Sequence, residues 1–489
     1  MAPPRGLTMW LALAVAAVGA SDKPRPGDAC VVVVDRAPLK SRGRTIARLA
    51  KGTQVSVLKV SKRSARVEAQ VDGKAKQGTM RLSHLRVAPA DPASLASHPA
   101  AAGQWPQFRG PNRDGKSTET GLLRKWPKRG PKRVWTARGC GVGWASVAVA
   151  DGRIHTAGSI GQATAVVAFD LDGKRLWQAD IGRAYSASYP GARSTPTVDD
   201  GRVYALSPFG DVACLDAQTG RKLWAINLCQ AFGGRRPTWA FAESLLVDGD
   251  RLICCPGGPS AGVVALDKRT GKRVWACGQA AGGAAYASPI AFDFAGRRHI
   301  VAMTGNAAVG IDAATGAFLW RHERPTAHRA NVPTPIHHNG HVFLASGYGQ
   351  GAELLKLRVH GARVTATPMW KNAMFDNHLG GVVLVNGYFY GCDANGNWMC
   401  LDFATGRATY RVPGVRVGSV IYADGHLYCL AQDRGVVAMV QAVPKRYKAI
   451  SAFAVPRANA QVWAHPAIAG GRLYIRYLDF LHAFDIKEP

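Results

Sequence analysis

The chain has 489 residues, ten cysteines and a formal net charge of +30 at pH 7. It contains no Cys-x-x-Cys-His motif, which excludes covalently attached haem, and no Gly-x-Ser-x-Gly motif of the kind that carries an α/β-hydrolase nucleophile. The positive charge is not accompanied by a nucleic-acid recognition motif, so we expect no nucleic-acid partner.

Residues 1–20 have the pattern of a secretory signal peptide. Arg5 precedes an apolar run over residues 7–18, and Ala20 precedes the expected cleavage point. The run is too short to span a bilayer comfortably, although an uncleaved anchor is the alternative. No later stretch resembles a membrane span. We therefore expect an exported, periplasmic or extracellular protein that is monomeric and has no transmembrane segment after cleavage.

Residues 27–88 form a separate small unit in this interpretation. Short strand-like runs alternate with turns over residues 30–34, 52–60, 65–71 and 78–85, and five short strands are expected. Lys51-Gly52-Thr53 and the closing Leu82-Ser83-His84-Leu85 resemble bacterial SH3-type modules, which implies a small SH3-like β-barrel. Residues 89–103 are rich in Ala and Pro and are predicted to be a linker.

Positive charge is concentrated in the first third of the chain. Residues 22–133 contain 25 Lys and Arg against 8 Asp and Glu. Such a surplus is typical of a surface that attracts anionic polymers, such as an anionic polysaccharide or lipid headgroups. The alternative is compositional, because abundant Arg and Ala also follow from a GC-rich genome.

The remainder of the chain, residues 104–489, is built on a repeated unit that residues 200–224 show best. Asp200-Gly201 and Gly210-Asp211 supply turns between strands, since Gly tolerates the positive φ of tight hairpins. The unit closes at Trp224. A unit of this size cannot bury its own apolar faces, so it is expected to stack on further copies.

Two features of the repeat can be counted. The closing aromatic residues lie 40 to 51 residues apart, a period typical of β-propeller blades: Trp135, Trp177, Trp224, Trp275, Trp320, Trp370 and Tyr410. The hairpin turn between the first two strands occurs eight times, at Asp151-Gly152, Asp200-Gly201, Asp248-Gly249, Ala295-Gly296, Asn339-Gly340, Asn386-Gly387, Asp424-Gly425 and Gly470-Gly471.

The last unit ends without a Trp of its own. We expect the strand around residues 133–136 to complete it with Trp135, which closes the ring and protects the exposed strand edges. The prediction is an all-β protein with an eight-bladed propeller over residues 104–489. Seven blades is the alternative, because the unit at Asp424 is irregular.

The Asp-x-x-Thr-Gly-x-x-x-Trp pattern, as in Asp216 to Trp224, resembles the tryptophan-docking motif of the pyrroloquinoline-quinone (PQQ) repeat superfamily. The resemblance extends over residues 105–486, and the segment at 105–115, WPQFRGPNRDG, resembles the start of planctomycete-type PQQ-like propellers. This implies a quinoprotein-type propeller. The superfamily contains quinone dehydrogenases and also non-catalytic scaffolds such as BamB-type outer-membrane assembly proteins, so the fold alone does not decide the function.

Dehydrogenases of this superfamily hold PQQ on the propeller axis, stacked on a Trp beside a disulfide of adjacent cysteines, with Ca²⁺ bound by Glu, Asn and Asp. The adjacent pair Cys254-Cys255 lies here in a predicted strand, where successive side chains face opposite sides. Only Glu243 and Asp376 supply carboxylates near the expected axis, whereas Ca²⁺ takes six to eight oxygen ligands. No cofactor and no metal are therefore predicted, with PQQ and Ca²⁺ as the alternative.

Most cysteines fall inside predicted strands, where Cys acts as a small apolar residue. Cys392 and Cys400 flank a hairpin, and a disulfide between them is left open.

The favoured function is a non-catalytic, exported propeller that binds a cell-envelope protein or an anionic polysaccharide. The alternative is a PQQ- or metal-dependent oxidoreductase that uses the same axial funnel. A third hypothesis is envelope anchoring through the SH3-like unit. Because loops at the starts of the innermost strands face the axis, the candidate binding residues are Trp144, Tyr189, Arg193, Trp239, Glu243, Tyr286, Arg329, Asn331, Asn377, His378 and His465.

Overall fold

The computed structural model describes residues 29–32, 37–41, 44–49, 54–60, 64–71, 74–81, 85–87, 103–361, 363–458 and 460–489. The chain divides into two compact units, Met1–Asp91 and Pro92–Pro489. The predicted signal peptide and nearly all of the predicted linker lie outside the described residues. No helix in the described part of the chain has the length and apolar character needed to span a bilayer.

The first unit contains an antiparallel sheet in the order β3-β2-β6-β5-β4-β1-β7. Its strands are β1 (Ala29–Val32), β2 (Ala37–Ser41), β3 (Arg44–Leu49), β4 (Gln54–Val60), β5 (Ser64–Val71), β6 (Lys74–Arg81) and β7 (Leu85–Val87). The described residues thus hold seven strands rather than the expected five. The β2–β3 hairpin was missed because it is rich in Arg and Lys and lacks a clear apolar alternation. The SH3-like assignment stays a prediction.

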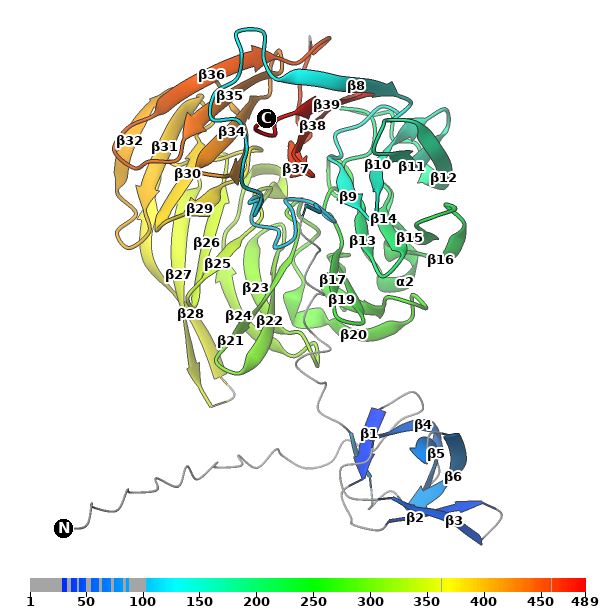
Figure 1. Ribbon diagram of the computed structural model, residues 1–489. Helices are drawn as coiled ribbons and strands as arrows, with labels where there is room; N and C mark the ends of the chain where they lie inside the picture. The colour runs from blue at the N-terminus through cyan, green and yellow to red at the C-terminus, as the bar shows by residue number, and fades with distance from the viewer. Residues whose placement is uncertain are drawn as a thin grey trace, which may run out of the picture. The chain divides into compact units, whose positions relative to one another are not determined.

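The second unit is a ring of blades (Figure 1). Its described strands form eight four-stranded antiparallel sheets. Blades 1 to 4 consist of β9 (Ala148–Ala150), β10 (Arg153–Ile160), β11 (Ala163–Asp170), β12 (Arg175–Arg183); β13 (Thr197–Asp199), β14 (Arg202–Leu206), β15 (Asp211–Asp216), β16 (Lys222–Asn227); β17 (Leu246–Asp248), β18 (Arg251–Cys254), β19 (Val263–Asp267), β20 (Arg273–Cys277); and β21 (Ile290–Phe294), β22 (Arg297–Met303), β23 (Ala307–Asp312), β24 (Phe318–Glu323).

Blades 5 to 7 follow in the same pattern. They consist of β25 (Ile336–His338), β26 (His341–Ser346), β27 (Gly351–His360), β28 (Arg363–Asn372); β29 (Val383–Val385), β30 (Tyr388–Cys392), β31 (Asn397–Asp402), β32 (Ala408–Pro413); and β33 (Gly418–Ala423), β34 (His426–Ala431), β35 (Val436–Gln441), β36 (Lys448–Ala454). Short helices α2 (Leu228–Phe232), η2 (Gly278–Ala280) and η3 (Ala327–Arg329) lie in loops between blades.

Blade 8 joins the two ends of the propeller. It contains β37 (Ala467–Ala469), β38 (Arg472–Tyr477) and β39 (Phe480–Asp485), and its outer strand is β8 (Lys132–Arg138) from the start of the unit. Trp135 of β8 pairs with Ala483 of β39. The predicted closure by the N-terminal strand is therefore confirmed, and the count is eight blades rather than seven.

The predicted hairpin turns have the geometry that their residues favour. At the first of them, Asp151 has φ 51° and Gly152 has φ 74°. Two consecutive residues with positive φ give a type I′ turn, whose twist matches that of the flanking strands. Asp and Asn tolerate this conformation better than other residues with a side chain, which explains their frequency at these sites.

The Trp motif joins each blade to the next. The side chain of Trp177 in blade 1 lies over Gly220 of blade 2, where an added Cβ would come within 2.6 Å of the indole, and its Nε1 donates to Ala217 O at 3.1 Å. Asp216 holds this turn by accepting hydrogen bonds from the amide and hydroxyl of Thr219, both at 2.8 Å. Because Gly220 has no Cβ, the motif leaves a flat surface, and the indole of the neighbouring blade packs on this surface.

Between blades, buried apolar side chains from adjacent sheets form shared clusters. Leu206 of blade 2 and Leu252 of blade 3 belong to one cluster, and Ile253 of blade 3 and Ile300 of blade 4 belong to the next. Each sheet is thus buried on both faces, which explains why its middle strands are apolar at nearly every position.

Blade 5 departs from this pattern. Its outer strands β27 and β28 are ten residues each, and a plain turn replaces the Thr-Gly motif between them. Trp320 of blade 4 therefore has no docking turn to meet, and its Nε1 has no hydrogen-bond partner among the described residues.

A segment before β8, residues 105–117, runs across the centre of the ring (Figure 1). We call it the crossing segment. Its backbone bonds to the inner-strand residues Val149, Val198 and Tyr422, and the guanidinium group of Arg113 bonds to Leu245, directly before β17. It thus contacts four blades. It therefore passes through the axial channel instead of lying on the outside of the propeller.

All nine cysteines whose side chains are described are free thiols. The disulfide left open between Cys392 and Cys400 is absent, because the register pairs Cys392 with Trp398 and Cys400 with Tyr390. The adjacent Cys254 and Cys255 are both buried and are also free.

Candidate functional site: an aromatic cavity on the propeller axis

A cavity of about 230 Å³ lies on the axis, where the loops before the inner strands converge. We call these the inner-strand loops. Seven of the eleven predicted residues line this cavity, which brings together positions more than 300 residues apart in the sequence: Trp144, Tyr189, Arg193, Trp239, Tyr286, His378 and His465.

Aromatic rings make up the cavity wall in two groups. On one side, Trp463 lies 4.5 Å from Trp144 and 4.9 Å from Tyr189 between ring centroids. On the other side, the centroids of Trp239 and Tyr286 are 5.8 Å apart, and the hydroxyl of Tyr286 accepts a hydrogen bond from the Trp239 amide. Tilted contacts at these distances are favourable ring geometries, so the walls hold their shape without a ligand.

Two tyrosines of the rim have unusual backbone conformations. Tyr189 has φ 56° and Tyr348 has φ 61°, and their side chains are 48% and 38% exposed. A bulky residue with positive φ is uncommon and costs energy, and such residues concentrate at binding sites. Neither ring is needed to fill the core, so the strain is consistent with a role for both rings at the cavity mouth.

The crossing segment forms the base of the cavity with Phe108 and Arg109. The Phe108 ring lies 5.0 Å from the ring of His465, whose Nε2 bonds to Leu379 O at 3.1 Å. Burial, together with the nearby charge of Arg109, lowers the pKa of His465 to about 3, so the imidazole is neutral at pH 7.

Arg109 is a cation without a bonded carboxylate. It is 2% exposed, and its Nη2 donates to the carbonyl groups of Asp114 and Val382. Its Nε and Nη1 atoms have no hydrogen-bond partner among the described residues. Burial lowers its pKa to about 10, which leaves the group charged at pH 7. The base of the cavity is therefore positively charged.

Arg193 adds a second positive charge in the wall. Its guanidinium group donates to the carbonyl groups of Gly191 and Tyr189 and lies 4.8 Å from the ring centroid of Tyr185. No Asp or Glu is among the described residues that line the cavity. Two Arg side chains in a lining without an acidic residue favour a ligand that carries negative charge.

Four predicted residues lie outside the cavity. Arg329 is exposed on a neighbouring loop. The other three are buried and face away from the cavity: Glu243, Asn331 and Asn377. Each directly precedes a lining residue, and successive side chains of an extended chain point to opposite sides. Burial raises the pKa of Glu243 to about 7, against the opposing effect of the Cys255 amide, to which its Oε1 is bonded at 2.7 Å.

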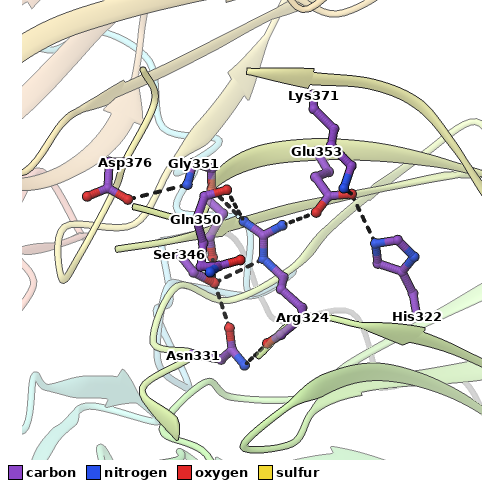
Figure 2. A network of polar contacts seen from close by, with 10 residues as sticks. His322, Arg324, Asn331, Ser346, Gln350, Gly351, Glu353, Lys371 and Asp376 are labelled. Carbon is purple, nitrogen blue, oxygen red and sulfur yellow. Dashed lines mark hydrogen bonds and ion pairs between the residues drawn. The ribbon is translucent and has the colours of Figure 1, made fainter. Parts of the chain in front are cut away.

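Asn331 belongs to a polar network that supports the wall (Figure 2). Its side chain accepts from Ser346 Oγ at 2.6 Å and donates to Arg324 O at 3.1 Å. Its backbone oxygen accepts from the amide of Tyr286 at 3.1 Å, so the network fixes one wall ring. The buried guanidinium of Arg324 is held in turn by the carboxylate of Glu353.

A second branch of the network reaches the rim. Asp376 Oδ1 accepts hydrogen bonds from the amide of Gly349 at 2.9 Å and from that of Gly351 at 3.3 Å. Asp376 and Gly351 are labelled in Figure 2. These glycines flank the loop that carries Tyr348, so the carboxylate holds the strained loop in place. Asp376 therefore acts on the cavity through the backbone and not as a ligand.

Four prominent lining residues were not predicted from the sequence: Phe108, Arg109, Tyr348 and Trp463. Trp463 was detectable, since it lies two residues before His465 and so on the same side of an extended chain. Tyr348 lies in the loop after β26 and not in an inner-strand loop. Only the glycines on either side of it indicate that this loop has an unusual backbone. The place of Phe108 and Arg109 depends on the path of the crossing segment, which no local pattern reveals.

Comparison with known proteins decides the family. A family model described as outer membrane protein assembly factor BamB matches residues 162–411, just over half of the chain. The chain belongs to this family. A curated BamB from Moranella endobia is 24% identical over 276 residues, which is 54% of this chain and 69% of the relative. The structure of BamB from Moraxella catarrhalis superposes with a TM-score of 0.54 at 17% identity, over 73% of this chain and 98% of that one.

Quinoproteins are also similar to this BamB-family propeller. A quinoprotein ethanol dehydrogenase from Pseudomonas aeruginosa is 31% identical over 132 residues, but these are only 27% of this chain and 18% of the enzyme. A quinohemoprotein alcohol dehydrogenase from Comamonas testosteroni has a TM-score of 0.57 at 13% identity, over 82% and 83% of the two chains. At that identity the likeness concerns the fold.

The cavity lining does not match a Ca²⁺-bound PQQ site. No Asp or Glu of the described residues lines it, and no group of three or more His, Cys, Asp or Glu side chains suited to a metal ion occurs in the described part of the chain. Glu243 is turned away from the cavity, and Cys254 and Cys255 are buried thiols. Ca²⁺ needs several oxygen ligands, which these residues do not supply.

Proposed function

We propose that this protein is an exported, non-catalytic propeller of the BamB family that binds a cell-envelope partner through the axial cavity. The observation that carries the proposal is the rim. Tyr189 and Tyr348 keep their rings exposed at the cavity mouth in strained backbone conformations. Rigid blades that present aromatic side chains from loops are typical of binding platforms.

Family membership supports the same proposal. The curated relative from Moranella endobia is called an outer membrane protein assembly factor, and a role in envelope assembly is the corresponding proposal for this chain. The oxidoreductase alternative has support from the quinoprotein relatives but not from the lining, which supplies no carboxylate to hold a metal or to act as a base.

Photo-crosslinking tests the proposal. Benzoylphenylalanine is introduced at Tyr189 or Tyr348 and, as a control, at Met369, which is exposed on the outer strand β28. Benzophenones insert into C–H bonds of both proteins and sugars, so the readout does not presuppose the partner's class. Adducts in intact envelopes are expected from the rim positions and not from Met369.

Equal adducts from all three positions would contradict binding at the cavity. Oxidation of an alcohol after addition of PQQ and Ca²⁺, lost in Trp239→Ala, would establish the oxidoreductase alternative instead.

A further inference from the structure

Beside the cavity mouth, three arginines gather around two aromatic rings. The guanidinium carbon of Arg183 lies 4.1 Å from the ring centroid of Phe209, and that of Arg193 lies 4.8 Å from Tyr185. Arg236 contacts both rings, at 5.4 Å from Phe209 and 5.7 Å from Tyr185. We call Arg183, Arg193 and Arg236 the arginine cluster. Arg193 also lines the cavity, so cluster and cavity are continuous.

The cluster carries a surplus of positive charge. None of its three members forms an ion pair with a described carboxylate, although 32 Asp and Glu occur in the whole chain. Asp211 lies next to Gly182, the residue before Arg183, and its two oxygens accept hydrogen bonds from Ser207 and Asn227. Its single negative charge offsets only part of the three positive charges. Like charges held close together repel each other, and aromatic faces compensate only part of that repulsion. The cluster is thus suited to receive an anion.

We propose that the arginine cluster and the cavity together bind the end of an anionic glycan, with a carboxylate or sulfate group on the cluster and one sugar ring in the cavity. This rests on the proposed function and names the chemical class of its ligand. Guanidinium groups bind both carboxylate and sulfate oxygens through paired N–H donors. The experiment below therefore distinguishes the two anions.

The shape and lining of the cavity favour a sugar over an acidic peptide. A volume of about 230 Å³ suits a single ring. The flat C–H face of a pyranose covers an aromatic face such as those of Trp144, Tyr189 and Trp463, whereas an Asp or Glu side chain is a thin aliphatic chain that leaves these walls bare. Peptides are usually bound along a free strand edge or an elongated groove, whereas this site is a compact cavity on the propeller axis.

The test is calorimetric titration of the full chain with four probes of matched length: a sulfated heparin tetrasaccharide, tetragalacturonate, neutral maltotetraose and tetraglutamate. Wild type is compared with the double variant Arg183→Gln/Arg236→Gln and with Tyr189→Ala. The control is Arg358→Gln/Arg363→Gln, which removes the same charge from the exposed β27–β28 hairpin.

We expect one of the two charged tetrasaccharides to bind at least about tenfold more tightly than maltotetraose, because a charge-assisted hydrogen bond contributes more than a neutral one. The cluster variant and Tyr189→Ala should each weaken that binding by about tenfold or more, while the control variant leaves it unchanged. The tetrasaccharide that binds more tightly identifies the anion.

Four outcomes would overturn the inference: no binding of either charged sugar, equal binding of the neutral sugar, an equal loss in the control variant, or equally tight binding of tetraglutamate. The last would point to an acidic peptide. Because photo-crosslinking at Tyr189 does not depend on the ligand's charge, rim adducts in the absence of glycan binding would overturn the inference and leave the proposed function standing.

Discussion

At the scale of single residues, His465 at the base of the cavity makes the stability of the protein depend on pH. His465 is buried, bonded through Nε2 and close to the charge of Arg109, and its pKa is lowered to about 3. An unfolded His has a pKa near 6.5. Below that value the unfolded chain takes up a proton that the folded chain does not, so acid favours unfolding.

His465 is therefore expected to reduce the free energy of unfolding by about 2 kcal/mol between pH 7 and pH 5. His465→Gln should remove this contribution and flatten the pH dependence by the same amount. Guanidinium unfolding at both pH values measures it, with His360→Gln, exposed on the β27–β28 hairpin, as the control. Parallel pH profiles for wild type and His465→Gln would contradict the assignment of a neutral, buried imidazole.

The glycine of the docking motif is a second residue with a measurable role. Gly220 has φ 74° and lies against the indole of Trp177, whereas Gly201 has φ 68° and nothing within 4 Å of an added Cβ. Ala at either site has the same backbone cost of about 1–2 kcal/mol. Gly220→Ala should lose a further 1–3 kcal/mol, roughly the cost of overpacking.

Thermal or chemical unfolding of Gly220→Ala and Gly201→Ala gives the difference directly. Equal losses would mean that the indole moves aside, and that the motif needs glycine for its backbone conformation alone.

Residue-scale features differ in how well the sequence predicts them. The docking Trp, Gly and Thr positions could be recognised because the motif repeats. The lining of the cavity was predicted less well, since Glu243 and Asn331 share loops with lining residues but point away from the axis. A loop has no fixed periodicity, so sequence places such residues near the axis without giving the direction of the side chain.

At the scale of the blade, stability depends on contacts made across blade boundaries. Trp275 and Trp320 occupy equivalent strands and are almost equally buried. Trp275 Nε1 donates to Ala313 O at 3.0 Å, but Trp320 Nε1 lacks a partner in the described residues. The replacement of the docking turn by the long β27–β28 hairpin explains the difference.

Replacing each Trp by Phe separates the hydrogen bond from apolar burial. Both variants lose similar apolar contact, but Trp275→Phe also loses a buried hydrogen bond worth about 1 kcal/mol. We expect Trp275→Phe to be the less stable of the two by that amount in chemical denaturation. A larger loss in Trp320→Phe would show that blade 5 contacts its indole more strongly than the missing docking turn suggests.

At the scale of the whole molecule, the ring depends on β8 from the N-terminal side. Thr136 pairs with His482 and Ala137 with Leu481. In an antiparallel pair only alternate amides face the neighbouring strand, so one of these two residues donates to β39 and the other faces outwards.

Proline at these two positions tests closure. One of Thr136→Pro and Ala137→Pro should cost about 3 kcal/mol or more, because it removes a ladder hydrogen bond, and the other should be tolerated at the sheet edge. Equilibrium unfolding in guanidinium measures both. Unchanged stability in both variants would mean that β8 contributes little to the closed ring.

The eight-bladed ring itself was predictable, because turn pairs such as Asn386-Gly387 mark each blade and Trp135 is left over at the start. Blade 5 was harder to interpret, because its outer hairpin keeps Trp370 while losing the Thr-Gly turn. The crossing segment was recognised as a motif but not as part of the channel, since its partners lie in blades spread over nearly the whole chain.

That crossing segment also constrains the order of assembly. It is made before any blade, yet it bonds to Val149 in blade 1 and to Tyr422 in blade 7, about 270 residues later. During synthesis its partners in blades 1 to 3 are made first, but its bonds to Tyr422 have to wait until almost the last strands have been made. Contacts so distant in sequence form slowly. The nascent protein thus passes through a long interval in which this aromatic and basic segment is only partly bonded, and its full enclosure in the channel marks completion of the ring.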